Sequence, residues 1–576
     1  MVSSAGRYTT RSRWRACRVP ATVLGLAIGA LVAGSAETST PGNEGILADA
    51  LRAHVEFLAS DTLEGRAVGE AGNERAIDYI AGVMADAGLR PAGADYRQPF
   101  PIASASLGPS GGIVLTAQPG RVTRYAVGDD FYPLPISASA NGGGDSIFAG
   151  YGISAPALGY DDYDGVDVSG RTVIVLRHEP EERLPASRFA GRELTEHATF
   201  ARKVEAARTR HAAALLIVPD GSHAEGANLT DVARVWPPVQ PGPDRGFELD
   251  DEAPATLPVG MMSIGLAERL LASSGREHRT IDAIRRVIDG RLEAAGADGV
   301  VSAPATFDLP GRRVEVRADI KRDRVGTSNV VGVVRGVDPR LADEQVVVGA
   351  HFDHVGVDAG HRVYNGADDN GSGTAALLEI ARATASAARQ GSAPRRTIVF
   401  AAWNAEEKGA LGSRYFVADA QSRSVLLAAM LNMDMIGRSE EVLDPDEPRF
   451  RGLRRSMARE NRDALHLIGY SLSPDLAATI ASLNDRSLLR LRTDYDANVQ
   501  NLLRRSDHWS FLERGIPAIF FTTGLHPDYH TPNDDAAKLD YVKLERIARL
   551  VHRVAWDVAN QDVAPPPVVA GSTRAP

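Results

Sequence analysis

The sequence predicts an α/β fold with a mostly parallel central sheet that is flanked by helices on both faces. From Asn329 onward, short apolar runs alternate regularly with amphipathic helical segments. Each apolar run is continuous rather than alternating, which is typical of strands that are buried on both faces. Such sheets bind ligands beyond the carboxyl ends of their strands. The residues that follow each run are therefore the candidate functional residues.

The N-terminal segment, residues 1–36, has the pattern of a secretory signal peptide. Five arginines precede the apolar run "ATVLGLAIGALVAGSA", which is shorter than the roughly 20 residues of a membrane-spanning helix. Its removal would change the net charge from −10 to −15, which argues against a nucleic-acid partner. Cys17, the only cysteine, lies in this segment. We therefore expect an exported bacterial protein, periplasmic or secreted, without disulfides and without stable membrane insertion after cleavage.

The rest of the chain divides by its patterning. Residues 45–130 and 291–562 form one discontinuous domain, which begins with a helical stretch whose apolar stripe ends at Gly88. Residues 131–290 mix strand-like runs with loops rich in Gly, Pro and Asp, and we expect an inserted β-rich module. The Pro-rich end, residues 563–576, is expected to be a disordered tail.

The main domain supplies its strands and helices in regular order. The expected elements are the strands "NVVGVV", "EQVVVGAHFD", "RTIVFAAW", "LLAAMLNMDMIG" and "IPAIFFTTG", with the helix "SGTAALLEIARATASAAR" after the second strand. Continuous apolar strands separated by helices indicate parallel pairing and a βαβ arrangement.

Acids and histidines follow these strands repeatedly. The candidate ligands are His351, Asp368, Glu407, Asp434 and His530. Imidazole and carboxylate ligands from separate strand ends suit Zn²⁺, with Mn²⁺ or Co²⁺ as less selective alternatives. Two metal ions need about this many protein ligands, with one carboxylate shared between the ions. The sequence therefore predicts two Zn²⁺ per chain.

These motifs, "AHFDHVG", "GADDNGSG", "AEEKGALGS", "NMDMIG" and "DYHTPND", resemble in order those of the co-catalytic di-zinc exopeptidase family. That family includes bacterial leucyl aminopeptidases, glutamate carboxypeptidase and transferrin-receptor ectodomains, and the resemblance covers residues 46–560. It implies a metallopeptidase in which Asp368 bridges the metals, His351 and Asp434 complete one site, and Glu407 and His530 complete the other.

The same resemblance assigns further roles. It implies that Glu406 is the general base that activates a metal-bound water, and that Asp353 holds His351 by a hydrogen bond. It also implies a cis peptide bond between Asp368 and Asp369. Tyr529 matches a tyrosine that steadies the tetrahedral intermediate in glutamate carboxypeptidase. Within residues 131–290, the motifs "YGISAPALGYDDYDGVDVSGRTVIVLRHEP" and "AARTRHAAALLIVPDG" resemble those of a protease-associated domain, which shapes substrate access in this family.

Other residues fit simpler roles. His354 and His361 are expected to be surface residues or residues that support the site from outside. Ser506 is a candidate N-cap for the helix "DHWSFLER", with Asp507 and His508 in its first turn. Ser110 fits the G-x-S-x-G pattern of serine hydrolases, but a strand-like run follows it, and a β-turn is the better interpretation.

The kind of peptidase depends on charges near the site. A free α-amine needs a carboxylate partner, whereas a terminal carboxylate needs a fixed cation. The acids Asp358, Asp369 and Glu440 favour an aminopeptidase that acts on peptides with a free N-terminus. Arg438 is the cationic candidate that keeps a glutamate-carboxypeptidase-type activity open. A receptor-like binding module that has lost its metals is the non-enzymatic alternative, but all the candidate ligands are present.

Overall fold

The computed structural model describes residues 40–568 in one compact unit. Within this span it leaves out residues 118–119, 129, 135, 183, 185–186, 190, 192–194, 222–228, 230–246, 250–255, 273–279, 297–298, 359, 440–449, 451–452 and 499. The expected signal peptide, Cys17, Glu440 and most of the expected tail lie outside the described residues. Among the described residues, no helix combines the length and the apolar character that crossing a membrane requires.

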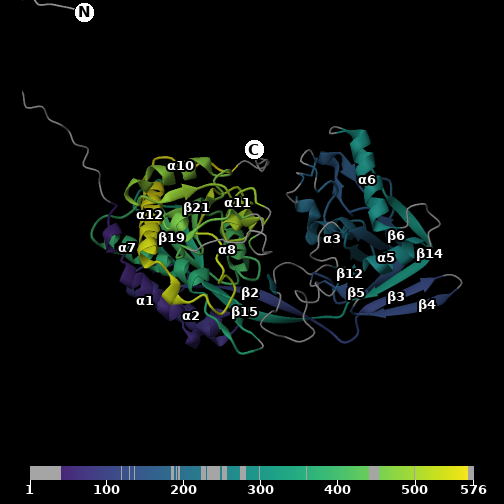
Figure 1. Cartoon of the computed structure of the whole chain (residues 1–576), viewed down its shortest axis with the longest axis horizontal. Coiled ribbons are helices and arrows are strands. Elements are labelled where there is room, and N and C mark those ends of the chain that lie inside the picture. The colour runs from purple at the N-terminus through teal and green to yellow at the C-terminus, as the bar shows by residue number, and fades with distance from the viewer. Residues whose placement is uncertain are drawn as a thin grey trace, which may run out of the picture. The chain divides into compact units, whose positions relative to one another are not determined.

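A ten-stranded sheet forms the centre of the first part of the fold (Figure 1). Its strands lie in the order β11-β2-β15-β19-β16-β20-β23-β21-β22, and β1 pairs with β15. Their bounds are β1 Arg90–Pro91, β2 Arg97–Leu107, β11 Phe247–Leu249, β15 Ile320–Val334, β16 Glu344–His351, β19 Thr397–Trp403, β20 Leu426–Met433, β21 Ala464–Ile468, β22 Arg490–Arg492 and β23 Ala518–Thr522.

Parallel pairing is confined to part of this sheet. The strands β19, β16, β20 and β23 are parallel neighbours, and β22 runs parallel to β21. The strands β15, β2, β11 and β1 pair antiparallel, as does β21 with β23. The α/β fold is thus confirmed, but its sheet is mixed, and the parallel part is the centre that carries the candidate ligands.

Helices cover both faces of the sheet, as expected for buried parallel strands. In β16, Val346, Val348 and Ala350 face a core shared with α1 (Ala48–Leu58), α2 (Ala71–Asp86), α7 (Gly373–Arg389) and α12 (Tyr541–Asn560). Val347 between them faces a second core, shared with α8 (Leu411–Ser422) and α11 (Trp509–Leu512). Figure 1 shows these two groups of helices on opposite sides of the strands. The expected helices correspond to α2 and α7.

The inserted residues build a second sheet of eight strands, in the order β4-β3-β14-β6-β9-β10-β12-β5. Their bounds are β3 Gly112–Ala117, β4 Arg121–Ala126, β5 Phe131–Pro133, β6 Asn141–Ala149, β9 Thr172–Leu176, β10 Ala214–Val218, β12 Val259–Met262 and β14 Thr306–Arg317. This sheet is wider than the expected insert 131–290, because β3, β4 and β14 belong to it. In contrast, β11 lies inside that range but pairs with β2 of the first sheet.

The remaining elements are short or belong to the second sheet. The helices α5 (Ile264–Ala272) and α6 (Ile281–Ala295) pack on one face of that sheet, and α3 (Phe200–Arg208) packs on the other. The shorter elements are β7 Ser154–Ala155, β8 Tyr160–Asp161, β13 Val301–Ser302, β17 Gly356–Val357, β18 Val363–Tyr364, α9 Ala458–Asn461 and α10 Pro474–Ser482.

Candidate metal centre

The candidate residues meet at one edge of the first sheet because parallel neighbours end there together. His351 is the last residue of β16, and Asp434 directly follows β20. Glu406 and Glu407 follow β19, and His530 lies in the loop after β23. The short helical turn η5 (Ala367–Ser372) brings the aspartate pair to the same edge, directly before α7.

The structure gathers these side chains into two groups whose ligand atoms lie within 4.8 Å of one another. The first group is His351, Asp369 and Asp434, in which His351 Nε2 lies 3.4 Å from Asp369 Oδ1 and 3.4 Å from Asp434 Oδ1. The second group is His354, Asp369, Glu407 and His530. In it, His530 Nε2 lies 3.0 Å from Asp369 Oδ2 and 3.1 Å from Glu407 Oε1.

Asp369, and not Asp368, is the carboxylate shared by the two groups. Its Oδ1 faces His351, and its Oδ2 faces His530. The prediction that Asp368 bridges two metals is therefore wrong by one residue. The Asp368 carboxylate points elsewhere, since its Oδ1 accepts a hydrogen bond of 2.6 Å from the Gly437 amide and its Oδ2 lies 3.4 Å from His526 Nε2. The cis peptide bond also lies one residue later than predicted, between Asp369 and Asn370.

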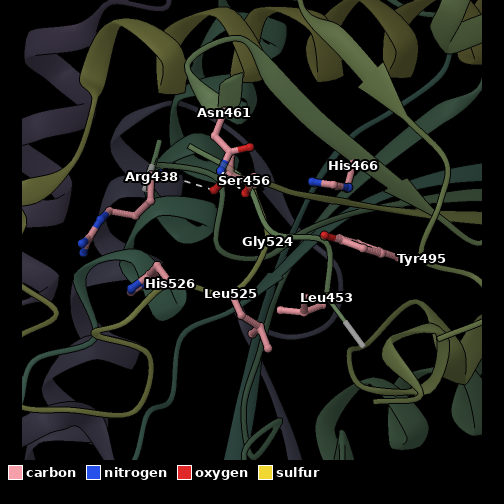
Figure 2. A pocket seen from close by; sticks show the side chains of 10 residues that line it. Arg438, Leu453, Ser456, Asn461, His466, Tyr495, Gly524, Leu525 and His526 are labelled. Atoms are coloured by element: carbon pink, nitrogen blue, oxygen red, sulfur yellow. Dashed lines mark hydrogen bonds between the residues drawn. The ribbon is translucent and has the colours of Figure 1, made fainter. Parts of the chain in front are cut away.

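A network behind the aspartate pair fixes its direction. Asp534 Oδ2 accepts hydrogen bonds from the amides of Asp368 and Asp369, at 2.9 and 3.0 Å. Arg438 lies 3.4 Å from Asp534 Oδ1 and donates to Asp528 at 2.7 Å. Arg438 and His526 also line a small cavity, which Figure 2 shows with their side chains at one end and the stacked rings of His466 and Tyr495 at the other.

Asp353 supports the site differently from the sequence-based expectation. Its carboxylate lies 3.8 Å from His351 Nδ1, whereas its backbone carbonyl lies 3.2 Å from that nitrogen and makes the hydrogen bond. The two carboxylate oxygens instead accept from the amides of Glu406 and Glu407, at 3.0 and 3.2 Å. The backbone of Asp353 therefore orients His351, and its side chain holds the glutamate pair.

Glu406 lies beside the first group without belonging to it. Its Oε2 is 3.9 Å from His351 Nε2, and its side chain is 12% exposed. Burial, together with the charges of Asp507, Glu407 and Asp434, raises the pKa of Glu406 well above its usual value, although His351 opposes the shift. The two adjacent glutamates thus face different neighbours, because Glu407 contacts His530 while Glu406 faces the His351 side.

Tyr529 lies at the open side of the centre. Its ring stacks on His530 with centroids 3.9 Å apart, and its hydroxyl lies 3.5 Å from Arg505. The His530 side chain is 34% exposed, so solvent reaches the second group from this side. Burial and the charges of Asp369 and Glu407 raise the pKa of the Tyr529 hydroxyl well above its usual value. Tyr529 therefore keeps its proton near neutral pH and can donate a hydrogen bond.

Three site residues were given other roles by sequence reasoning. His354 is fully buried in the second group, while His361 is exposed as expected. Ser506 does not cap a helix, because its hydroxyl donates to Asp434 Oδ2 at 2.7 Å and α11 begins only at Trp509. Asp507 is fully buried, and burial raises its pKa to about 7. The sequence does contain an indication for His354, because it is the second histidine of "HFDH" and lies three residues after the candidate ligand His351.

Arg66 is a further buried residue that sequence reasoning missed. Its guanidinium donates to the carbonyls of Phe352 and Gly366, at 2.7 and 2.9 Å, and also to those of Leu58 and Asn365. The carbonyls of Phe352, Asn365 and Gly366 belong to the loops that lead into His354 and Asp369, whereas Leu58 is the last residue of α1. Arg66 thus ties the loops that carry His354 and Asp369 to each other and to α1.

The rival site around Ser110 lacks the geometry of a nucleophile. Its amide and hydroxyl both bind Asp319 Oδ2, at 3.0 and 2.6 Å. The strand β3 follows Ser110 where a nucleophile elbow would require a helix. The expected β-turn interpretation therefore fits the structure.

The donor set of the two groups fits zinc. Ligand atoms around one tetrahedral zinc ion lie roughly 3.3 Å apart, given bond lengths of about 2.0 to 2.2 Å. The distances above, from 3.0 to 3.4 Å, are close to that spacing. His530 Nε2 and Asp434 Oδ1 are also buried atoms that have no hydrogen-bond partner among the described residues. A cation in the first group would satisfy Asp434 Oδ1, and a cation in the second group would satisfy His530 Nε2.

Comparisons with known proteins show what the part of the chain around this site is similar to. Residues 329–555 match the model of "Peptidase family M28". A "Probable zinc metalloprotease" of Pyricularia oryzae is 29% identical over 312 residues, which cover 50% of this chain and 59% of that protein. A "Probable leucine aminopeptidase" of Arthroderma benhamiae is 27% identical over 257 residues, which cover 44% of this chain and 62% of that protein. The chain thus spans about three fifths of the length of these relatives.

A solved structure, "Aminopeptidase from Aneurinibacillus sp. strain AM-1", aligns with 92% of this chain and 98% of its own, at 17% identity and a TM-score of 0.49. The family match covers the strands β16, β19, β20 and β23 and contains both ligand groups. This part of the chain, residues 329–555, is therefore similar to peptidase family M28.

Proposed function

We propose that the chain is a two-zinc exopeptidase that removes residues from the N-terminus of peptides. The observation that carries this proposal is the Asp369 carboxylate, which places one oxygen in each of two ligand groups. This arrangement suits two metals that share a carboxylate. Mn²⁺ and Co²⁺ are the alternatives for the same donor set. The intact ligand set favours catalysis over a receptor-like binding role.

The residues around the two groups suit hydrolysis of a peptide bond. Zinc, when bound, would polarise the scissile carbonyl and lower the pKa of water. The Glu406 carboxylate accepts the proton of the attacking water and passes it to the leaving amine, since its side chain faces the first group without being one of its ligands. The Tyr529 hydroxyl donates a hydrogen bond to the oxygen on which negative charge develops, since its ring stacks on His530 at the open side of the second group.

The pairing of Arg438 supports an aminopeptidase over a carboxypeptidase. A carboxypeptidase needs a cation that is available to the terminal carboxylate. Arg438 is only 3% exposed and already contacts Asp528 and Asp534. It therefore serves the network that holds the aspartate pair. Asp358, one of the acids considered for the substrate amine, is likewise paired, with Arg362 at 2.7 Å.

Export and a role of the second sheet in substrate access are further parts of this proposal. The arginine-rich leader and apolar run of residues 1–36 support export across a membrane. The motifs of the inserted segment support its resemblance to a protease-associated domain. N-terminal sequencing of protein recovered from the periplasm or medium tests the first point, and cleavage near residue 36 is the expected result.

A substrate panel tests the activity. Leucyl p-nitroanilide should be hydrolysed and its N-acetylated form should not, because an aminopeptidase needs the free amine. Peptides that carry a blocked amine and a free carboxyl terminus should remain intact. Cleavage of the blocked peptides from their carboxyl ends, without cleavage of leucyl p-nitroanilide, would establish the carboxypeptidase alternative. A lack of hydrolysis of every substrate by zinc-loaded protein would favour the binding module.

A further inference from the structure

His354 is a buried histidine of the second ligand group to which the family resemblance assigns no specific role. It is fully buried, and its ring lies against the backbone of Gly366. A Cβ atom at Gly366 would lie 2.6 Å from two atoms of the His354 ring, so a side chain there would displace the ring. The ring also packs edge-on against His530, with centroids 5.5 Å apart. The imidazole is therefore held in one place.

Only one ring nitrogen of His354 faces the ligand group. Nδ1 makes a hydrogen bond of 2.9 Å with Glu407 Oε1 and lies 3.7 Å from Asp369 Oδ2. Nε2 is buried and has no hydrogen-bond partner among the described residues. A metal-binding histidine almost always donates its other N–H to an acceptor. His351 has such an acceptor in the Asp353 carbonyl, at 3.2 Å from its Nδ1, whereas His354 has none in the described structure.

Two further hydrogen bonds join the segment "HFDH" to the glutamate pair. The Asp353 carboxylate accepts from the amides of Glu406 and Glu407, which fixes their backbone. The hydrogen bond from His354 acts instead on the Glu407 side chain. The backbone of Glu407 and its carboxylate are thus held by two consecutive residues.

We propose that His354 is a positioning residue for the metal position formed by Asp369, Glu407 and His530. In this role, Nδ1–H donates to Glu407 Oε1 and fixes the carboxylate against Asp369 and His530. We assign the proton to Nδ1 because Glu407 is the acceptor within hydrogen-bond distance. This inference rests on the proposed two-metal function and adds a specific asymmetry, since His354 bonds Glu407 of the second group and approaches only the shared Asp369 of the first, on its Oδ2 side.

The test is a competitive titration of the metal-free protein with Zn²⁺ against a chromophoric chelator, which reports two dissociation constants. His354→Ala and His354→Leu both remove the N–H, and leucine also fills the ring space. Each should weaken one metal position by about 10 to 100-fold and leave the other unchanged. His354→Asn should retain near-wild-type affinity, because its amide N–H can replace Nδ1–H as the donor. His361→Ala, in the exposed loop that follows, is the matched control and should bind like the wild type.

Three results of the titration would overturn the positioning role of His354. Equal loss in His354→Asn and His354→Ala would overturn the positioning role and indicate direct ligation, because an amide restores the donor but is a poor zinc ligand. Unchanged affinity in both His354→Ala and His354→Leu would overturn any role of this residue. Failure of the wild-type protein to bind two ions would refute the proposed function together with this inference. Thermal unfolding of the metal-free variants separates these effects from loss of the fold.

Discussion

Asp369 places one carboxylate oxygen in each ligand group, whereas the neighbouring Asp368 contacts the Gly437 amide and His526. Asp368→Asn and Asp369→Asn are therefore a matched pair of isosteric changes. Asp369→Asn should lower kcat/KM at least about 10²-fold, since weakened metal binding removes several kcal/mol of charge stabilisation in the transition state.

Asp368→Asn should retain both metals and much of the activity, because an asparagine oxygen can still accept from Gly437. The measurement is kcat/KM with leucyl p-nitroanilide, together with the zinc content of each variant. Greater loss in Asp368→Asn than in Asp369→Asn would reverse the assignment of the shared carboxylate.

Glu406 supports a separate prediction at the same scale. Glu406→Gln preserves the size of the side chain but cannot accept a proton. We expect kcat to fall by about 10² to 10⁴-fold, with bound zinc and KM close to wild type. Steady-state kinetics and metal analysis on the same preparation provide the check. Near-normal kcat in this variant would assign Glu406 a structural role only.

At the scale of helices and strands, part of the fold around this site could be predicted from the sequence and part could not. The strands β16, β19, β20 and β23 and the helix α7 could be predicted, because continuous apolar runs and helical periodicity are local properties of the sequence. The antiparallel pairing of β15 with β2 and β19 could not, since a run such as "NVVGVV" carries no mark of strand direction. The choice between Asp368 and Asp369 likewise depends on the conformation of η5 and on the hydrogen bonds that their amides donate to distant Asp534.

The helix α12 supports a prediction about pH. His552 in α12 is fully buried, its Nδ1 lies 3.0 Å from Asn43 Oδ1, and burial with nearby Arg553 lowers its pKa to about 3. Its unfolded pKa is about 6.5, so unfolding takes up a proton below that pH. The stabilisation is thus present above about pH 6.5 and is lost as pH falls toward 3.

His552→Asn can keep the hydrogen bond to Asn43 but does not titrate. The melting temperature of this variant should therefore fall less steeply between pH 6.5 and 4 than that of the wild type. Thermal unfolding followed by circular dichroism across this pH range measures the two slopes. His361→Asn, at an exposed position, should leave the wild-type slope unchanged. Identical slopes for His552→Asn and the wild type would show that His552 is not charged on unfolding.

At the scale of the whole molecule, the chain combines two sheets, and the candidate ligands lie at one edge of the first. The first sheet brings ligands from well-separated positions, between His351 and His530, to one edge. The second sheet interrupts the first in sequence, between β2 and β15. Its existence could be predicted from composition, but its bounds could not, because β14 pairs with β3 and β6, which are far away in the chain, and β4 joins the sheet through its neighbour β3.

The central claim is that each chain binds two metals that share the Asp369 carboxylate. The most direct measurement is the zinc content per chain after equilibrium dialysis, by mass spectrometry of the metals, for the wild type, Asp434→Asn and Asp369→Asn. We predict two zinc ions in the wild type, about one in Asp434→Asn and fewer than one in Asp369→Asn. Fewer than two ions in the wild type, or two ions retained in Asp369→Asn, would contradict the account.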